Sequence, residues 1–283
     1  MPIDLDYVGR QSQAHAHAYT WRDQIIYALG IGASRDELPY LYEGTEGGLK
    51  TYPTFGVIPA YAPVFELVGA AGIEMHQVVH GAQSITCHAP LPAEGEVTTV
   101  ATFDKVYDLK RFLQLKLKTE TRREDELVQV GEWTIVVRGE GGFGGERPPL
   151  NEAPKIPRDR DPDWVHRQKT GPEQALLYRL SGDLNPLHAD PVAAAEVGFE
   201  EGPILHGLAT FGFLARAAIA ECAGGDADRL ETVAAQFRKP LWPGDTIETR
   251  GWTLDDGRVA LQAQVDGRSG AVVTNAWATF RDG

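Results

Sequence analysis

The sequence has few cysteines and no long hydrophobic run, and each lack excludes a class of protein. Its 283 residues include two cysteines, Cys87 and Cys222, and each lies in an apolar stretch without a second Cys or His at metal-ligand spacing. We therefore expect two core thiols rather than a disulfide or a metal site. A membrane-spanning helix needs roughly eighteen apolar residues in a row, and no stretch of the sequence reaches that length. We expect no contact with a membrane.

Positive charge is also scarce. The chain has 27 Lys and Arg against 40 Asp and Glu, a net charge of -13, and no run of cations. Nucleic-acid binding depends on clustered Lys and Arg, so a nucleic-acid partner is excluded, whereas a small anionic ligand needs only a few local cations. The N-terminus (1–11) has no apolar signal core, and the last four residues (280–283) are not a peroxisomal address. The predicted location is the cytoplasm.

A glycine- and proline-rich segment divides the chain. Hydrophobic residues make up 42% and charged residues 24%, which is typical of a packed globular core. Between residues 137 and 164 the periodicity is lost, in a run that contains a glycine-rich stretch (139–145) and then Pro148, Pro149, Pro154, Pro157 and Pro162. Gly permits unusual backbone angles and Pro blocks regular pairing. The expected domains are 1–150 and 151–283.

The two halves resemble each other. Residues 58–73 form an apolar stretch that is followed by PLPAEGE at 90–96, and residues 204–219 form a similar stretch that is followed by PLWPGD at 240–245. This predicts one unit used twice, about 150 residues apart. In each unit the pattern indicates a long helix and then several strands, which we place at 97–103, 112–121, 127–138, 259–265 and 271–280, with another beginning near Thr246.

A helix that is apolar on nearly all sides must be buried. The simplest architecture is an antiparallel sheet wrapped around the helix, which is the hot-dog arrangement. Two such units in one chain would pack side by side with a continuous sheet. The predicted fold class is therefore α+β, a double hot-dog.

A cluster of polar side chains lies at 178–191 (YRLSGDLNPLHADP). Gly182 and Pro186 break any helix there, so that Asp183, Asn185 and His188 can converge on one pocket. A carboxylate and an imidazole at this spacing can share one water. Capping of a helix or turn is the alternative role for Asp183 and Asn185, because Asp and Asn near Pro often act in this way.

A second element lies at 202–212 (GPILHGLATFG). Pro203 fits the entry to a helix, which places Gly207 in the first turn, where backbone N–H groups lack partners and the helix dipole favours negative charge. Such an N–H can hold a thioester oxygen. The alternative is that Gly207 only permits close packing. His206 could contact the ligand or bond a backbone group.

These two runs resemble the hydratase 2 (MaoC-like) family, which includes the (R)-specific enoyl-CoA hydratases and the hydratase portion of peroxisomal multifunctional enzyme type 2. The likeness continues through most of the chain, in the stretches YTWRDQIIYALGIGA (19–33), PTFGVIP (53–59), HGAQ (80–83), GGFGGER (141–147) and FRKPLWPGD (237–245).

The resemblance implies a hydro-lyase that reversibly adds water to a trans-2-enoyl-CoA and gives a (3R)-hydroxyacyl-CoA. Asp183 and His188 would bind and activate the water, Asn185 would help to fix the thioester, and Gly207 would supply the oxyanion N–H. Such acid–base chemistry requires no metal and no redox cofactor. Asp183 is assigned as the main base, and the group that protonates C2 is left open.

The resemblance also implies where CoA binds. His80 and Gly81 match positions that contact the thioester arm, and Phe237 matches an aromatic that lines the substrate site. The family places a lysine after an Asp near the position of Lys110, and this sequence departs from that pattern by one residue. Lys110 and Arg111 are therefore equal candidates for the CoA phosphates.

The first unit lacks an Asp-x-Asn-Pro-x-His motif. Its equivalent region carries only scattered acids and aromatics, namely Asp36, Glu37, Tyr40, Tyr42 and Glu43. We infer one active site per chain, with a first unit reshaped for the acyl tail and part of CoA, or with these aromatics serving ordinary packing. The expected partners are an acyl-CoA substrate and a second copy in a homodimer. A straight-chain fatty enoyl-CoA, a short-chain ester and a branched or steroid side-chain ester are all compatible with the sequence, and the extra room from the first unit favours medium or longer chains. A hot-dog acyl-CoA thioesterase and a non-catalytic acyl-CoA-binding subunit are the alternative functions.

Overall fold

The protein, seen here as a computed structural model that describes residues 5–282, is built from ten strands, five α-helices and short 3-10 helices (η) in that range. Residues 1–4 and Gly283 lie outside the described residues. The expectations of no signal core at 1–11 and no peroxisomal address at 280–283 rest partly on them. In chain order the elements are η1 Leu5–Tyr7, β1 His15–Tyr19, α1 Trp21–Gly30, η2 Arg35–Tyr40, η3 Pro53–Gly56, α2 Val57–Ala70, η4 Met75–Gln77, β2 Val78–Cys87, β3 Gly95–Asp108, β4 Phe112–Arg123, β5 Glu126–Arg138, β6 Trp164–Lys169, α3 Gln174–Tyr178, η5 Arg179–Ser181, η6 Pro186–His188, α4 Pro191–Glu196, α5 Gly207–Ala223, η7 Ala227–Arg229, β7 Leu230–Phe237, β8 Thr246–Thr253, β9 Val259–Val265 and β10 Ala271–Phe280.

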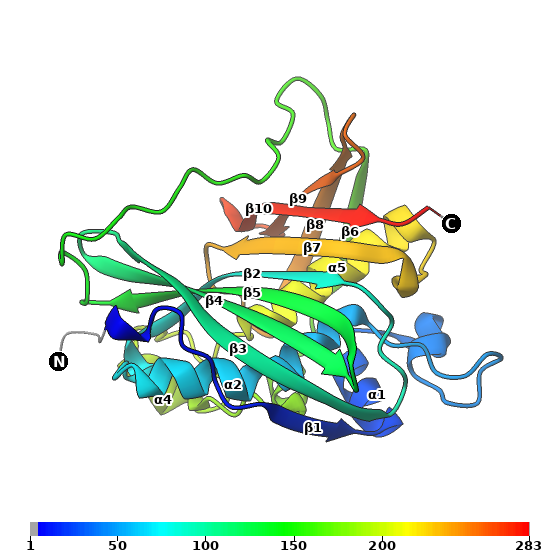
Figure 1. Cartoon of the computed structure of the whole chain (residues 1–283). Coiled ribbons are helices and arrows are strands. Elements are labelled where there is room, and N and C mark those ends of the chain that lie inside the picture. The colour runs from blue at the N-terminus through cyan, green and yellow to red at the C-terminus, as the bar shows by residue number, and fades with distance from the viewer. Residues whose placement is uncertain (1–4, 283) are drawn as a thin grey trace.

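All ten strands belong to one antiparallel sheet in the order β1-β3-β4-β5-β2-β7-β10-β9-β8-β6 (Figure 1). Strands β1 to β5 form one half of the sheet, in the order β1-β3-β4-β5-β2 from one edge. Strands β6 to β10 form the other half in the corresponding order from the opposite edge, β6-β8-β9-β10-β7. Strands β2 and β7 join the halves, with Ser84 opposite Ala234 in the middle of their pairing. The double hot-dog, an α+β fold, is confirmed. The first half ends its strands at Arg138 and the second begins at Trp164, and the boundary near residue 150 stays a prediction.

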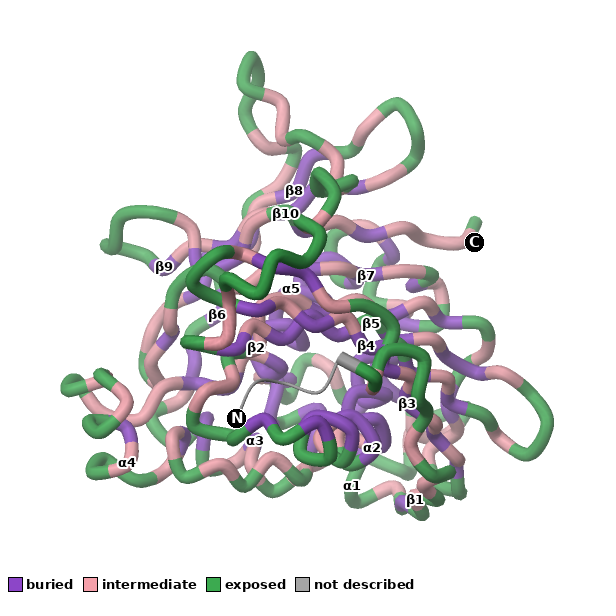
Figure 2. Tube along the Cα trace, turned by 60° about the vertical axis from the view of Figure 1, so that its left-hand side comes forward, coloured by how far each residue is buried: buried purple, intermediate pink, exposed green. Residues whose placement is uncertain are grey.

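Helix α5 is the buried centre of the second unit. Every residue from Leu208 to Ile219 is buried, because the helix lies along β6, β7, β8 and β10 (Figure 2). Large side chains such as Phe211 and Phe213 are wholly removed from water, and each contributes roughly 1.5–3 kcal/mol. The helix ends at Gly224, whose left-handed φ of 61° suits glycine.

Helix α2 takes the same place in the first unit, along β1, β3 and β4. Its buried residues include Val57, Val64 and Leu67, which repeat at helical spacing. The apolar stretches predicted at 58–73 and 204–219 are therefore the two central helices. The strands predicted at 259–265 and 271–280 match β9 and β10, and the other strands extend a few residues beyond their predicted ends.

The predicted helix entry at Pro203 is wrong, because α5 begins only at Gly207. The backbone before it is committed to other partners: Leu205 N–H donates to Leu241 O at 2.6 Å, and Ile204 O accepts from His188. Those bonds keep the segment extended and move the first turn to Gly207.

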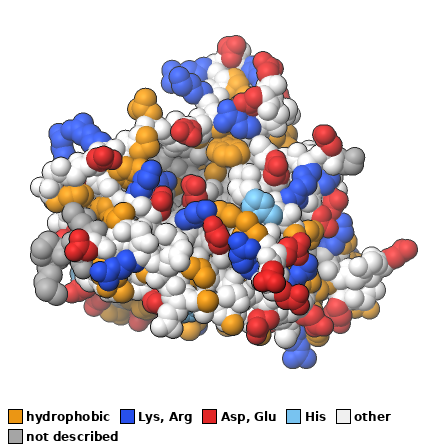
Figure 3. All heavy atoms as spheres, viewed as in Figure 1, with side chains coloured by type: hydrophobic (Ala, Val, Ile, Leu, Met, Phe, Trp, Pro, Cys, Tyr) orange, Lys and Arg blue, Asp and Glu red, His pale blue; other side chains and the backbone are white. Residues whose placement is uncertain are grey.

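The surface in Figure 3 shows acidic and basic side chains interspersed, with apolar side chains between them. Both cysteines are free thiols: Cys87 is buried and Cys222 is partly buried against the core. Within residues 5–282, the helices are too short or too polar to cross a membrane.

Candidate active site

The polar loop between α3 and α4 carries the candidate catalytic residues. It leaves η5 through Gly182, whose φ of 130° strongly favours glycine, and then reaches η6 through Asn185. The Asn185 side chain caps η6 by accepting a hydrogen bond from Leu187 N–H at 3.0 Å, and Pro186 follows at the first position of that turn. The capping alternative is correct for the Asn185 oxygen. Its amide nitrogen stays available to a ligand.

Asp183 lies between the two units. Its Oδ1 accepts a hydrogen bond from the Tyr61 hydroxyl of α2 at 3.0 Å and another from Asn185 N–H at 3.2 Å. Both donors bind the same oxygen, and among the described residues Oδ2 has no hydrogen-bond donor. The carboxylate is thus held on one side and keeps the lone pairs of its second oxygen for a water.

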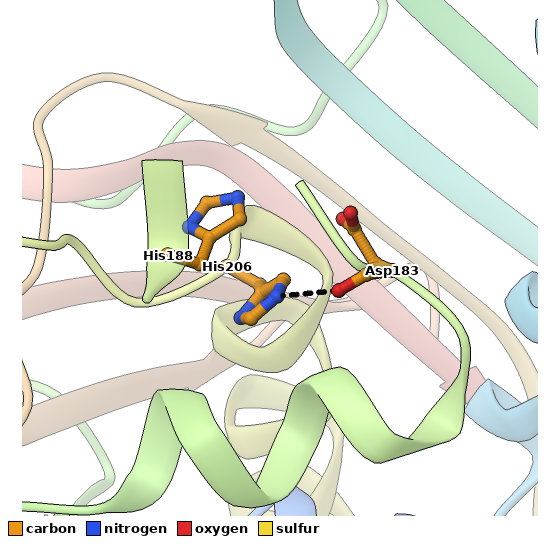
Figure 4. A group of neighbouring side chains, drawn as sticks. All are labelled: Asp183, His188 and His206. Atoms are coloured by element: carbon orange, nitrogen blue, oxygen red, sulfur yellow. Dashed lines mark hydrogen bonds between the residues drawn. The ribbon is translucent and has the colours of Figure 1, made fainter. Parts of the chain in front are cut away.

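His188 and His206 form a stacked pair beside Asp183 (Figure 4). The ring centroids are 3.7 Å apart and the planes differ by 25°. His188 Nδ1 bonds Ile204 O at 2.8 Å, and His206 Nε2 bonds the backbone O of Asp183 at 3.2 Å. A carbonyl only accepts, so these ring nitrogens carry the protons. His188 Nε2 therefore holds a free lone pair.

Burial keeps both imidazoles uncharged. Burial lowers the pKa of His188, although Asp183 nearby opposes the shift. Burial, together with the neighbouring His188, lowers the pKa of His206 well below its ordinary value. At neutral pH the site accordingly contains a neutral His188 with its acceptor nitrogen uncovered.

Possible ligand atoms of Asp183, His188 and His206 lie within 4.8 Å of one another. His188 Nδ1 and His206 Nε2 are committed to bonds with backbone carbonyls, which leaves one nitrogen on each of the two stacked rings. A tetrahedral cation needs ligands that converge. The arrangement suits acid–base chemistry better than metal binding.

The start of α5 and the junction of the units form the other part of the site. Gly207 is the first residue of α5, so its N–H lacks an acceptor within the helix. A Cβ added to Gly207 would lie 3.6 Å from the Phe237 ring, an ordinary contact. Close packing therefore does not require glycine at this position. It does at Gly212, where a Cβ would lie 2.2 Å from Ile31 of the first unit.

His80 completes this group. Its ring stacks on Trp133 at a centroid distance of 5.1 Å and meets the Phe237 ring edge-on at 5.2 Å. Gly81 occupies the irregularity in the β2–β5 pairing, which separates His80 from Ala82. The structure thus brings His80, Gly81 and Phe237 together at the β2–β7 junction, beside the N-terminus of α5.

Lys110 and Arg111 lie apart from these residues, on the exposed turn between β3 and β4. The Asp108 carboxylate fixes this turn by accepting N–H bonds from Lys110, Gly142 and Gly144. The hydrogen bond from Gly142 N–H, and then those from Lys110 and Gly144, lower the pKa of Asp108. The glycine-rich stretch at 139–145 is therefore anchored to the turn, and the cations at its edge stay candidates for the phosphates.

The region of the first unit that corresponds to the loop of Asp183 holds a different arrangement. The Glu37 carboxylate forms an ion pair with Arg216 of α5 at 2.7 Å and accepts a hydrogen bond from Tyr52. Tyr52 stacks on Tyr40 at 4.0 Å. A cavity of about 430 Å³ lies beside these side chains. Tyr40 and Tyr52 are buried, as the packing alternative predicts, whereas Tyr42 is 52% exposed.

Sequence reasoning missed Tyr61, because it lies 122 residues from Asp183 and belongs to no motif. It left the role of His206 open, and the structure shows the backbone bond. Possible ligand atoms of Asp183 and His188 lie within 4.8 Å of each other, whereas the Asn185 side chain bonds Leu187 N–H, and the convergence of all three on one pocket stays a prediction.

The chain was compared with known proteins. The profile of the MaoC like domain matches residues 153–275, and that of the MFE-2 hydratase 2 N-terminal domain matches residues 17–139. The chain is 37% identical over 277 residues to the 3-hydroxyacyl-thioester dehydratase Y of Mycobacterium tuberculosis, covering 96% of this chain and 94% of that protein. The chain belongs to the MaoC-like, hydratase 2 family.

Two further relatives agree with this membership. The peroxisomal enoyl-CoA hydratase 2 of Arabidopsis thaliana is 35% identical over 277 residues, covering 91% of this chain and 89% of that protein. The crystal structure of a MaoC-like dehydratase from Phytophthora capsici superposes with a TM-score of 0.88 at 31% identity, covering 99% of this chain and 98% of that one. In this MaoC-like chain the polar loop lies in the region of the MaoC like domain, whereas Tyr61 and His80 lie in that of the hydratase 2 N-terminal domain.

Proposed function

We propose that the protein is an (R)-specific enoyl-CoA hydratase that reversibly adds water to a trans-2-enoyl-CoA, giving a (3R)-hydroxyacyl-CoA. The observation that carries this proposal is a pair of acceptors, Asp183 Oδ2 and His188 Nε2, that have no hydrogen-bond partner within residues 5–282 and lie in the loop before a helix whose first N–H has no acceptor in that helix. The names of two relatives, a 3-hydroxyacyl-thioester dehydratase and an enoyl-CoA hydratase 2, support the same reaction.

The two acceptors match the two hydrogens of one water. A water that donates to Asp183 Oδ2 and to His188 Nε2 has its oxygen lone pair free to attack C3 of the enoyl thioester. The attack forms the C3–O bond and moves the π electrons through C2 to the thioester oxygen. Asp183 takes the proton from the water as the main base, and neutral His188 orients the water and shares in the proton transfer.

The negative charge on the thioester oxygen needs a donor that is already in place. Gly207 N–H, at the positive end of α5, supplies it, and the free amide nitrogen of Asn185 holds the thioester. The enolate collapses when the pair returns one proton to C2. The product thus contains both hydrogens and the oxygen of one water, so the reaction is redox-neutral and needs no redox cofactor.

The CoA moiety takes the other half of the site. His80 and Gly81 at the β2–β7 junction contact the thioester arm, and Phe237 lines the acyl end. Burial lowers the pKa of His80 to about 4, so its ring is uncharged and presents an apolar surface. Lys110 and Arg111 are the cations proposed for the CoA phosphates. Cytoplasm and homodimer stay our expectations for location and assembly, and gel filtration with light scattering tests the second.

The reaction is tested by incubating the purified chain with crotonyl-CoA and 2-decenoyl-CoA. We expect loss of the conjugated enoyl absorbance and a product that only a (3R)-specific dehydrogenase oxidises. Asp183→Ala and His188→Ala should each lose about 100-fold or more of kcat, because each removes one holder of the water. Wild-type protein that leaves both esters unchanged would refute the proposal, and release of free thiol would indicate the thioesterase instead.

A further inference from the structure

Tyr61 is a side chain of the first unit that reaches the candidate base of the second. It extends from α2, packs its ring on Phe65 at a centroid distance of 4.4 Å, and donates its hydroxyl hydrogen to Asp183 Oδ1 at 3.0 Å. Burial, and then the charge of Asp183, raise the pKa of Tyr61 above its ordinary value. The phenol therefore stays protonated at working pH and acts as a permanent donor.

The duplicated fold offers an internal comparison for this contact. In each unit a histidine of the edge strand pairs with a glutamate of the central helix, His15 of β1 with Glu66 of α2 and His166 of β6 with Glu221 of α5. These two pairs show which position of α2 corresponds to which position of α5. Tyr61 lies five residues before its glutamate, and in α5 the residue at that position is Arg216.

Both of these helix residues bind a carboxylate of the opposite unit. Tyr61 binds Asp183, and Arg216 binds Glu37 through Nε to Oε1 at 2.9 Å and through its terminal nitrogen to Oε2 at 2.7 Å. Tyr52 donates to Oε1 of Glu37 as well, and Ser34 N–H donates to Oε2. Both oxygens of Glu37 are therefore occupied.

These contacts have opposite effects on the ability of Glu37 and Asp183 to act as a base. Burial alone would raise the pKa of Glu37, but the hydrogen bonds and charge of Arg216 outweigh it and lower that pKa. Glu37 is thus a saturated, weakly basic group. Asp183 has a neutral phenol in place of the guanidinium, so only Oδ1 is held and Oδ2 can take a proton from water.

We propose that Tyr61 is a positioning residue for the reaction, which holds Asp183 Oδ1 and thereby aims Oδ2 at the water. The first unit, which lacks the catalytic motif, then supplies part of the active site. The choice of Tyr or Arg at this helix position determines which of the two related carboxylates acts as a base. This inference rests on the proposed hydratase activity.

The test uses the full-length protein with Tyr61→Phe, which removes one hydroxyl. We expect kcat for 2-decenoyl-CoA to fall about 10- to 100-fold with KM nearly unchanged, because the base is misdirected while the substrate contacts remain. The acidic limb of the kcat/KM profile should move to higher pH, since loss of a donor favours the protonated carboxyl. Tyr61→His, which retains a donor, should recover part of the loss.

Tyr61→Arg should occupy both carboxylate oxygens of Asp183, as Arg216 helps to do for Glu37, and should therefore abolish turnover. The matched control is Tyr40→Phe, which removes a buried hydroxyl that bonds Gly225 O and Ala227 N–H, away from Asp183, and should leave kcat and the pH profile unchanged. Circular dichroism and thermal unfolding establish that each variant is folded. If Tyr61→Phe does not fold, the pH profile of Tyr61→His decides, because a displaced donor should also move the acidic limb.

Wild-type kcat and pH profile in Tyr61→Phe, beside an inactive Asp183→Ala, would overturn the role of Tyr61 and leave the hydratase function intact. If wild-type protein hydrates neither ester, the proposed function itself fails. The two failures are therefore distinguishable.

Discussion

At the scale of single residues, the neighbours of a side chain decide its chemistry. Asp183 and Glu37 are carboxylates at related places in the duplicated fold, yet one keeps an uncovered oxygen and the other is bound on both by Arg216, Tyr52 and a backbone N–H. The same holds for the histidines. His188 and His206 are buried and His80 is partly buried, and burial lowers the pKa of all three, whereas His76 keeps 67% of its side-chain surface exposed.

The neutral state of His80 has a consequence for stability. Its pKa in the folded protein, about 4, lies below the ordinary value of 6.5, so the unfolded chain binds more protons between these values and stability falls as pH decreases through this window. The loss should reach about 3 kcal/mol. We expect urea unfolding at pH 7.5 and pH 4.5 to show a smaller loss in His80→Phe than in wild type. His76→Ala, at an exposed site, should match the wild type, and an equal loss in all three proteins would contradict the argument.

At the scale of elements, the position at which α5 begins is the main determinant of the site. Its first N–H belongs to Gly207 because the preceding residues use their backbone groups elsewhere, in the bond of Leu205 to Leu241 and that of Ile204 to His188. The positive end of the helix dipole and the Gly207 N–H, which has no acceptor within the helix, then lie at the same place. His206, just before this helix, has ψ near 139°, which is the conformation that a following proline prefers.

Gly207→Pro therefore removes the proposed oxyanion donor without disturbing the helix, since proline is well accepted at the first helical position. We expect kcat to fall about 100- to 1000-fold. Gly207→Ala keeps the N–H, and its Cβ makes only ordinary contact with Phe237, so it should retain most of the activity. Steady-state kinetics on both variants, with circular dichroism, gives the comparison. Equal activity in the two would exclude this N–H as the oxyanion donor.

At the scale of the whole molecule, the two units form one continuous structure. They share the sheet through β2 and β7, and Gly212 lets α5 approach Ile31 of the first unit closely. Arg216 adds a buried link, because it binds both Glu37 and the backbone O of Ile31. The candidate active site includes residues from both sides of this junction, because Tyr61 of the first unit donates a hydrogen bond to Asp183 of the second.

Arg216→Met should cost about 3 kcal/mol or more of the free energy of unfolding, because Glu37 is then left largely buried without its cation. Lys50→Met is the matched control, since Lys50 also pairs across the units, with Asp226, but both side chains are more than 40% exposed. It should cost less than about 1 kcal/mol. Urea unfolding followed by fluorescence measures both variants. A single transition is expected in each, and similar costs for the two pairs would contradict the importance of the buried one.

The sequence by itself determined the class of fold and the main group of catalytic candidates. Two apolar stretches about 150 residues apart indicate two buried helices, and each needs a set of strands to cover it. Gly182, Asn185 and Pro186 determine a tight local turn, so the convergence of Asp183 with His188 was predictable from the chain itself. These are local effects, in which short-range geometry leaves few alternatives.

The residues that lie opposite that turn depend on long-range packing. The contact of Tyr61 with Asp183 joins residues 122 positions apart, and the stacking of His206 on His188 depends on where α5 begins. Neither follows from local pattern, because the docking of one unit on the other sets both. The pairing of Glu37 with Arg216 has the same origin. In this packing both carboxylate oxygens of Glu37 are bound, whereas among the described residues Asp183 is bound on one oxygen.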